Sequence, residues 1–207
     1  ADQIDAVFEA MPPDAVKVGM PSTPACMEAV AAGLKKYRPR HVVIDPVMYA
    51  KNGSPLMQES AISALRSTVL PLATLLTPNI PEAEKLAGME ISSEADMREA
   101  ARRIQALGPQ NVLVKGGHAQ GEARDILLCG EDFHVFASRR IPTKNTHGTG
   151  CTLSSAIAAY LARGEALPEA VRKAKEYVTG AIEHALPLGH GCGPTHHFFA
   201  FYEADCD

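Results

Sequence analysis

The sequence lacks the features that mark membrane, secreted and nucleic-acid-binding proteins. No apolar run approaches the roughly 20 residues needed to cross a bilayer. The N-terminus has neither the basic region nor the apolar segment of a signal peptide. The net charge is −4 and the lysines and arginines are scattered, which argues against binding to a phosphate backbone. We therefore expect neither a membrane nor a nucleic-acid partner.

Paired cysteines are also missing. The chain has five widely separated cysteines and no Cys-x-x-Cys: Cys26, Cys129, Cys151, Cys192 and Cys206. The odd number, the wide spacing and the lack of a Cys-x-x-Cys together argue against a disulfide framework and a structural zinc site, and favour a reducing cytoplasm. Cys26 and Cys129 are expected to be small buried apolar residues.

Strands rich in Val, Ile and Leu alternate with helical segments along the 207 residues. This pattern predicts a single α/β domain with a mostly parallel sheet and helices on both faces. The expected strands are 15–20, 41–46, 74–79 and 111–117, followed by a hairpin of 124–129 and 133–141. The expected helices are 3–11, 24–37, 60–70, 81–86, 94–107, 149–163 and 168–186.

Two of these helices have clear start signals. Ser22-Thr23-Pro24 combines a capping hydroxyl with a proline at the first helical position. Ser93 with Asp96 three residues later is close to a capping box.

Polar groups lie at the carboxyl ends of predicted strands or in the loops after them: Asp45, Asn79, Lys115 and the turn Gly148–Cys151. In parallel sheets, ligands bind beyond the carboxyl ends of the strands. We therefore expect these groups to lie on one rim, which a purely structural role does not explain.

The turn before the helix at 149–163 has the composition of an anion site. Gly148 and Gly150 allow the backbone to pass close to an anion. The first-turn N–H groups of the helix then point at it, with Cys151 beside them. Alone, the same turn is equally compatible with an ordinary loop-to-helix junction. The interpretation as an anion site therefore depends on the other polar groups of the rim.

Asn79 and Glu82 present an amide and a carboxylate across a turn, and such hard oxygen ligands suit Mg²⁺ held through water. Asp45 could reach the same water shell. The alternatives are that Asn79 caps a helix while Glu82 is solvated, and that Asp45 anchors its loop. Lys115 with Gly116 suits a nucleotide phosphate, although an exposed lysine before a turn is common.

Four motifs carry a family resemblance: Asp45-Pro46-Val47-Met48, Thr77-Pro78-Asn79-Ile80-Pro81-Glu82-Ala83, Lys115-Gly116-Gly117-His118 and Thr146-His147-Gly148-Thr149-Gly150-Cys151-Thr152. In this order they resemble the ribokinase superfamily, and within it the hydroxymethylpyrimidine/phosphomethylpyrimidine kinase branch. The tail at 189–198 resembles the C-terminal signature of that branch. The resemblance covers essentially the whole chain and implies a ribokinase-like fold.

The resemblance implies roles for the phosphate side of the site. Asn79 and Glu82 match a motif that organises Mg²⁺ and phosphate, and Gly148, Gly150 and Cys151 match an anion-hole turn. Most ribokinase-like enzymes have an aspartate base where Cys151 stands. We expect the helix N-terminus to lower the pKa of the Cys151 thiol, so that it could accept a substrate proton.

The resemblance also assigns the two organic ligands. Lys115, Gly116, Thr146 and Val178 match the nucleotide site. Met20 and Val47 match positions that line a pyrimidine pocket.

These roles imply an ATP- and Mg²⁺-dependent kinase, expected to be a homodimer. Its substrates would be 4-amino-5-hydroxymethyl-2-methylpyrimidine and its monophosphate, which becomes the diphosphate used in thiamine biosynthesis. Two alternatives remain: a pyridoxal/pyridoxine kinase of the same branch, and a non-catalytic nucleotide-binding module.

One departure from the family pattern lies ahead of Ala1. The family opens with a strand, a Gly-Gly-rich segment, a substrate-contacting glutamine and a lid-like region, and none of these precedes Ala1. The single kinase domain at 1–207 is thus expected to lack its N-terminal segment. Either the chain is a fragment or preceding residues are omitted from the sequence, and the intact remaining pattern favours omission. A chain truly starting at Ala1 would expose a sheet edge and have little activity.

Overall fold

The fold is organised by a six-stranded sheet. The computed structural model describes residues 1–21, 23–50, 53–117 and 123–202. The strands follow one another across the sheet in chain order. They are β1 (Ala15–Val18), β2 (His41–Ile44), β3 (Leu75–Leu76), β4 (Asn111–Val114), β5 (Ala123–Cys129) and β6 (Asp132–Ser138).

Parallel pairing joins β1 to β4, and antiparallel pairing joins β4, β5 and β6. The β5–β6 hairpin turns at Gly130, whose φ of 61° lies in the left-handed region that glycine adopts without strain. The predicted mostly parallel sheet and its hairpin are confirmed. The parallel strands bring the residues that follow them to one edge of the sheet.

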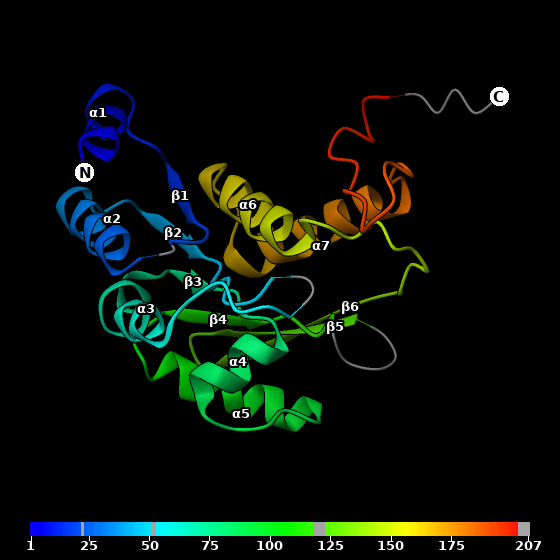
Figure 1. Cartoon of the computed structure of the whole chain (residues 1–207), viewed down its shortest axis with the longest axis horizontal. Coiled ribbons are helices and arrows are strands. Elements are labelled where there is room, and N and C mark those ends of the chain that lie inside the picture. Colours follow the sequence, from blue (N-terminus) through cyan, green and yellow to red (C-terminus); the bar gives the residue numbers. More distant parts are fainter. Residues whose placement is uncertain (22, 51–52, 118–122, 203–207) are drawn as a thin grey trace.

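Helices cover both faces of the sheet (Figure 1). They are α2 (Pro24–Tyr37), α3 (Glu59–Ala64), α4 (Ile80–Ala87), α5 (Glu94–Gln105), α6 (Thr149–Ala162) and α7 (Leu167–Glu183), and a further helix, α1 (Asp2–Ala10), packs on α2. In Figure 1, α6 and α7 lie above the sheet and α4 and α5 lie below it. This is the layered α/β architecture that the alternating sequence predicts.

Neighbouring strand residues alternate between two hydrophobic cores. Val42 and Ile44 point into a core with the helices from α2 to α5, whereas Val43 packs with α6 and α7. All three are almost fully buried. A strand buried on both faces reads as continuous Val and Ile, which is why the segment at 41–44 shows no polar alternation.

The predicted helix starts agree with the structure. Thr23 caps α2 by accepting a hydrogen bond from Cys26 N–H at 3.2 Å, and Pro24 is the first helical residue. Ser93 and Asp96 form a reciprocal capping box at the start of α5. Ser22, named with Thr23 as part of the start signal, lies outside the described residues.

Two local expectations differ from the structure. The segment expected as one helix at 60–70 is instead α3, then a π-helical turn at Leu65–Val69, then a 3₁₀ turn at Leu70–Leu72. Pro71 lies in that last turn, and a proline cannot donate the hydrogen bond that would continue an α-helix. Cys26 is exposed and Cys129 only partly buried, so the prediction that both are buried is wrong. His118 and Cys206 lie outside the described residues.

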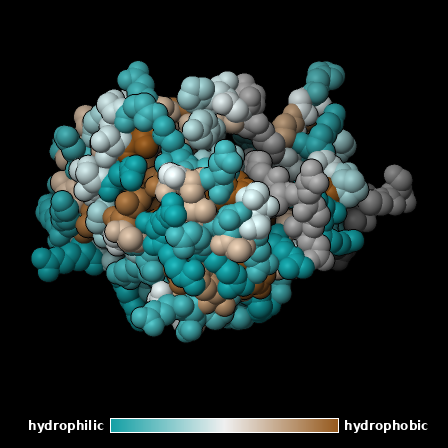
Figure 2. Space-filling view, turned by 90° about the horizontal axis from the view of Figure 1, so that it is seen from below, coloured by the Kyte–Doolittle hydropathy of each residue, from teal (hydrophilic) through white to brown (hydrophobic). Residues whose placement is uncertain are grey.

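The surface below the sheet is mainly hydrophilic, with hydrophobic residues scattered singly or in small groups (Figure 2). Among the described residues, no helix is both long and apolar enough to span a membrane. Scattered apolar residues are normal for a protein surface.

Candidate active site

The centre of the site is a buried ion pair on the rim of the sheet. Asp45 follows β2 and Lys115 follows β4, and the Lys115 Nζ lies 2.8 Å from the Asp45 Oδ1. Their side chains are only 3% and 13% exposed. The Thr77 hydroxyl, after β3, donates a longer hydrogen bond of 3.4 Å to the same carboxylate oxygen. Residues that follow three successive parallel strands therefore meet here, as predicted.

Lys115 stays charged in this setting. Burial opposes its ammonium form, but the Asp45 and Glu82 carboxylates outweigh burial and raise the pKa of Lys115 above its usual value. A charged ammonium at the rim is suited to phosphate.

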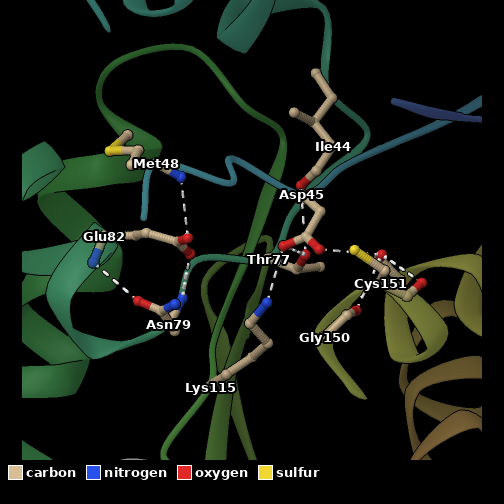
Figure 3. Close-up of polar contacts among 10 residues, drawn as sticks. Ile44, Asp45, Met48, Thr77, Asn79, Glu82, Lys115, Gly150 and Cys151 are labelled. Carbon is tan, nitrogen blue, oxygen red and sulfur yellow. Dashed lines mark hydrogen bonds and ion pairs between the residues drawn. The ribbon is translucent and has the colours of Figure 1, made fainter. Parts of the chain in front are cut away.

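Asn79 and Glu82 form a capping box at the start of α4 (Figure 3). The Asn79 Oδ1 accepts from the Glu82 N–H at 3.0 Å, and the Glu82 Oε2 accepts from the Asn79 N–H at 2.8 Å. The other oxygen, Oε1, accepts from the Met48 N–H at 3.3 Å. Asn79 thus caps the helix, as one alternative held. Glu82, however, is 2% exposed and is not solvated.

Burial raises the pKa of Glu82 above its usual value, against the opposing effects of Lys115 and the two backbone N–H groups. Its oxygens, like those of Asp45 and Asn79, already accept hydrogen bonds from the protein. Each of these oxygens has a further lone pair beyond the hydrogen bonds named here. A hard cation held here through its water shell fits this donor set. Across the described part of the chain, no group of three His, Cys, Asp or Glu residues forms a direct metal cage.

The N-terminus of α6 lies on the opposite side of the ion pair (Figure 3). Gly148 precedes the helix with φ of 79° and ψ of 0°, in the left-handed region. The Thr152 N–H bonds to the Gly148 carbonyl at 2.8 Å, but no acceptor among the described residues pairs with the N–H groups of Gly150 and Cys151. These donors and the positive end of the helix dipole are available to an anion.

Gly150 brings α6 close to the ion pair. A Cβ at this position would lie 3.2 Å from Lys115 Nζ and 3.8 Å from Asp45 Oδ2. The Ser154 hydroxyl, one turn further on, is 3.4 Å from Asp45 Oδ2. The helix N-terminus and the ammonium therefore face the same small region, as the rim prediction requires.

The C-terminal segment braces the same turn. His147 N–H donates to the Gly193 carbonyl at 3.0 Å. The Thr152 Oγ1 is hydrogen-bonded to His197 Nε2 at 3.0 Å, and the same hydroxyl donates to the Gly148 carbonyl at 2.8 Å. Sequence reasoning gave neither Thr152 nor His197 a part in holding the turn.

Gly116 is fixed against the β5 strand. A Cβ at Gly116 would lie 1.8 Å from the Arg124 carbonyl oxygen, which only glycine permits. Its N–H donates to the Asp125 Oδ1 at 2.8 Å. The contact places Gly116 at the rim, next to Lys115.

The remaining predicted site residues are more dispersed. Val178 is buried in the core beneath α6 and α7. Met20 follows β1, is 50% exposed and lines a cavity of about 390 Å³ with residues of α1 and α2. Val47 follows Asp45 after β2 and is partly buried. Thr146 precedes the turn, and its carbonyl accepts the Thr149 hydroxyl at 2.8 Å.

A second cavity, of about 620 Å³, opens beside Cys151. It runs along the outer face of α6 past Tyr160 to Arg163, with Tyr177 and His197 contributing to its lining. Cys151 is exposed at one end of this cavity. A ligand bound at the turn would therefore have room to extend along α6.

Comparisons with known proteins show which family this chain resembles. The family model described as phosphomethylpyrimidine kinase matches residues 1–196. The bifunctional thiamine biosynthesis protein ThiED of Geobacter sulfurreducens is 56% identical over 97% of this chain, which spans 41% of that protein.

Two solved structures are also similar. The ADP complex of Bacillus subtilis pyridoxal kinase is 40% identical, with a TM-score of 0.88 over 97% of this chain and 75% of that one. The phosphomethylpyrimidine kinase of Clostridium difficile 630 is 46% identical, with a TM-score of 0.78 over 87% and 74% of the two chains.

A ribokinase-like sheet with a lysine, a capped Asn-x-x-Glu turn and an open helix N-terminus on one rim defines a small-molecule phosphotransferase. The match of the family model to 196 of the 207 residues narrows this class. The chain belongs to the phosphomethylpyrimidine kinase family.

Proposed function

We propose that the protein containing this chain transfers the γ-phosphoryl group of ATP to 4-amino-5-hydroxymethyl-2-methylpyrimidine and to its monophosphate, giving the diphosphate for thiamine biosynthesis. One observation carries the proposal: the Lys115 ammonium, 2.8 Å from Asp45, faces the open N-terminus of α6 across Gly150. Phosphoryl transfer depends mainly on positioning and neutralising a group with spread negative charge. This rim supplies both a cation and backbone donors.

The α6 turn would stabilise the transferred group. The N–H groups of Gly150 and Cys151, with Gly148 giving the turn its left-handed conformation, are arranged as preorganised donors. Such donors act most strongly where charge develops during the reaction. Lys115 would neutralise an adjacent phosphate oxygen.

Cys151 would act as the base that accepts the proton of the substrate hydroxyl. Its position in the first turn of α6 and its exposure to the second cavity support this role. A general base typically contributes about 10²–10⁴-fold to such a step.

Mg²⁺ would be held through water by Asp45, Asn79 and Glu82, whose oxygens match its preference for hard ligands. When bound, the ion neutralises the charge of the nucleotide phosphates. These protein groups would orient its water shell, since both the capping box and the Asp45 pair fix their side chains.

The nucleotide would lie along Lys115, Gly116 and Thr146, with Val178 supporting the site from the core. Kinases similar to this chain have been solved with ADP, which supports ATP as the co-substrate. The pyrimidine would lie near Met20 and Val47, which follow the adjacent parallel strands β1 and β2.

Pyridoxal is the second candidate substrate, because the Bacillus subtilis structure to which this chain is 40% identical is a pyridoxal kinase. The pyrimidine is favoured because the family model and the 46%-identical Clostridium difficile structure carry the phosphomethylpyrimidine name. We further propose a homodimer that works in the cytoplasm, because the five scattered cysteines with no Cys-x-x-Cys are typical of a reducing compartment.

The test is coupled ADP release by the full natural chain with Mg-ATP. Hydroxymethylpyrimidine monophosphate is compared with pyridoxal and with a reaction lacking acceptor. Fast turnover on the pyrimidine phosphate supports the proposal, and turnover on pyridoxal alone transfers the enzyme to vitamin B6 metabolism. Silence on both acceptors would favour the non-catalytic alternative. Sedimentation of the same sample tests the homodimer.

A further inference from the structure

We propose that Asp125 and Lys175 form a positioning pair for the phosphate site, fixing the peptide that follows Lys115. This inference rests on the proposed function, because it assigns the pair to the nucleotide side of that site. The pair lies behind the rim, on β5 and α7, and touches neither the Asp45 carboxylate nor the α6 turn in the contacts described above.

The pair is buried and fully engaged. Lys175 Nζ lies 2.6 Å from Asp125 Oδ2, and the two side chains are 11% and 8% exposed. The same ammonium donates to the Ala123 carbonyl at 2.9 Å. The other carboxylate oxygen, Oδ1, accepts the Gly116 N–H at 2.8 Å. Each of the two charged groups therefore contacts the other and, in addition, one backbone group.

The Gly116 peptide is the point at which this pair reaches the site. Gly116 directly follows Lys115, and its Cα is pressed against the Arg124 carbonyl, where a Cβ would come within 1.8 Å. A displacement of this peptide moves the base of the Lys115 side chain. The 2.8 Å contact of Lys115 with Asp45 then changes with it.

A core built only for stability would not need these charges. Replacing a buried ion pair with apolar residues of similar volume is often neutral or stabilising. An apolar pair could join β5 to α7 equally well, but it could not accept the Gly116 N–H. The Asp125 carboxylate accepts this N–H, and Lys175 neutralises its charge. The core thereby holds a hydrogen-bond acceptor that points at Gly116.

Asp125 also acts on Lys115 through space. Its negative charge is among the groups that favour the protonated ammonium of Lys115. The effect is smaller than that of Asp45 and Glu82, in agreement with a supporting position behind the rim.

The test separates the hydrogen bond from the charge by using two double variants of the full natural chain. D125N/K175M removes both charges but keeps an oxygen for the Gly116 N–H. D125L/K175M removes the acceptor as well. R172M breaks an exposed ion pair with Glu176 on the same helix and is the control.

The readouts are the dissociation constant of Mg-ADP by calorimetry, KM for ATP and kcat at saturating acceptor, with circular dichroism reporting folding. We expect D125L/K175M to weaken ADP binding and raise KM for ATP about tenfold, the loss of about one hydrogen bond to a charged group. D125N/K175M should remain within about twofold of wild type. In D125L/K175M, kcat should fall by a smaller factor than KM for ATP rises.

A folded D125L/K175M that binds ADP like wild type overturns the inference. If that variant unfolds, D125A/K175M replaces it. Unfolding of both would make the pair a folding element and would equally overturn the positioning role. A wild type that binds ADP but phosphorylates neither acceptor overturns only the proposed function, whereas a wild type that binds no ADP overturns both.

Discussion

The two sides of the site are built in opposite ways. On the α4 side, Asn79 and Glu82 satisfy each other and the backbone, and Glu82 is buried. On the α6 side, Cys151 is exposed and the N–H groups of Gly150 and Cys151 have no acceptor among the described residues. The ion pair of Asp45 and Lys115 lies between the two sides.

This difference indicates that the α4 side holds the site rigid and that the α6 side would contact the ligand. The α4 side is held by its own hydrogen bonds before any ligand arrives, so changes there should affect both stability and activity. On the α6 side, the two N–H groups take no part in holding the fold of the described residues, so changes there should affect activity while leaving the fold intact. A helix end whose N–H groups remain unpaired is suited to an incoming anion.

The largest effect should come from removing the link between the two sides. Lys115→Met leaves the Asp45 carboxylate buried without its ammonium partner. We expect a loss of about 3–5 kcal/mol in the free energy of unfolding. We also expect a fall in kcat/KM of about 10²–10³-fold. Urea unfolding and steady-state kinetics measure the two quantities.

Lys85→Met is the matched control, because Lys85 pairs with Glu59 at 2.5 Å on the surface, where both side chains are exposed. Exposed pairs contribute little to stability. Equal losses in the two variants would show that the buried pair has no special role.

The α6 side is tested by Cys151→Ala. The thiol is exposed, so the melting temperature should stay the same, while kcat should fall about 100-fold if the thiol is the base. Cys26→Ala is the control, since Cys26 is also exposed and lies in the first turn of α2. Undiminished turnover of Cys151→Ala would show that Cys151 is not the base.

The α4 side is tested by Glu82→Gln. The amide can accept only one of the two N–H bonds from Asn79 and Met48, and its NH₂ group faces the other donor. We expect the free energy of unfolding to fall by about 1–3 kcal/mol near neutral pH. Activity should fall together with stability, in contrast to Cys151→Ala.

Glu82 also predicts a pH dependence. Burial raises its folded-state pKa above the usual 4.5, so the folded protein binds this proton more tightly than the unfolded chain. The contribution of this proton to stability is complete below the unfolded pKa and is lost as the pH rises through the folded pKa. The stability difference between wild type and Glu82→Gln should therefore shrink as pH rises above about 4.5. A difference that grows with pH contradicts this prediction.

The smallest effect should come from Gly150→Ala. The new Cβ would lie 3.2 Å from the Nζ of Lys115, which would have to shift by a few tenths of an ångström. We expect a few-fold rise in KM for ATP and an unchanged melting temperature. Gly191→Ala, whose Cβ meets nothing within 4 Å, is the control. A similar KM in both variants would mean that α6 does not need to approach Lys115 closely.

The sequence predicts what depends on neighbours in the chain. Asn79 and Ser93 cap helices in the way that their local spacing indicates, whereas the part of the buried Glu82 in the capping box was not predicted. Asp45 and Lys115 meet because each follows a parallel strand, and parallel strands end on the same edge of a sheet.

Contacts between distant residues were not predictable in the same way. Ser154 reaches Asp45 from 109 residues away, and a serine inside a helix carries no signal for such a bond. Lys175 was given no role in the sequence analysis, although it stands four residues after the buried Val171 and three before the buried Val178. That spacing places the lysine on the apolar face of α7 and was the available signal. Cys26 was assigned to the core from its residue type alone, and it lies on the exposed side of α2.

The separation of the site residues along the chain also bears on how the protein folds. The contact between Lys115 and Asp45 spans 70 residues and the one between Ser154 and Asp45 spans 109. Closing such long loops costs chain entropy before any contact repays it, and proteins rich in distant pairings fold slowly. The anion turn can meet the β2 rim only after the intervening strands are aligned. During refolding, nucleotide binding should therefore return after secondary structure, which makes it a sensitive reporter of the last step of assembly.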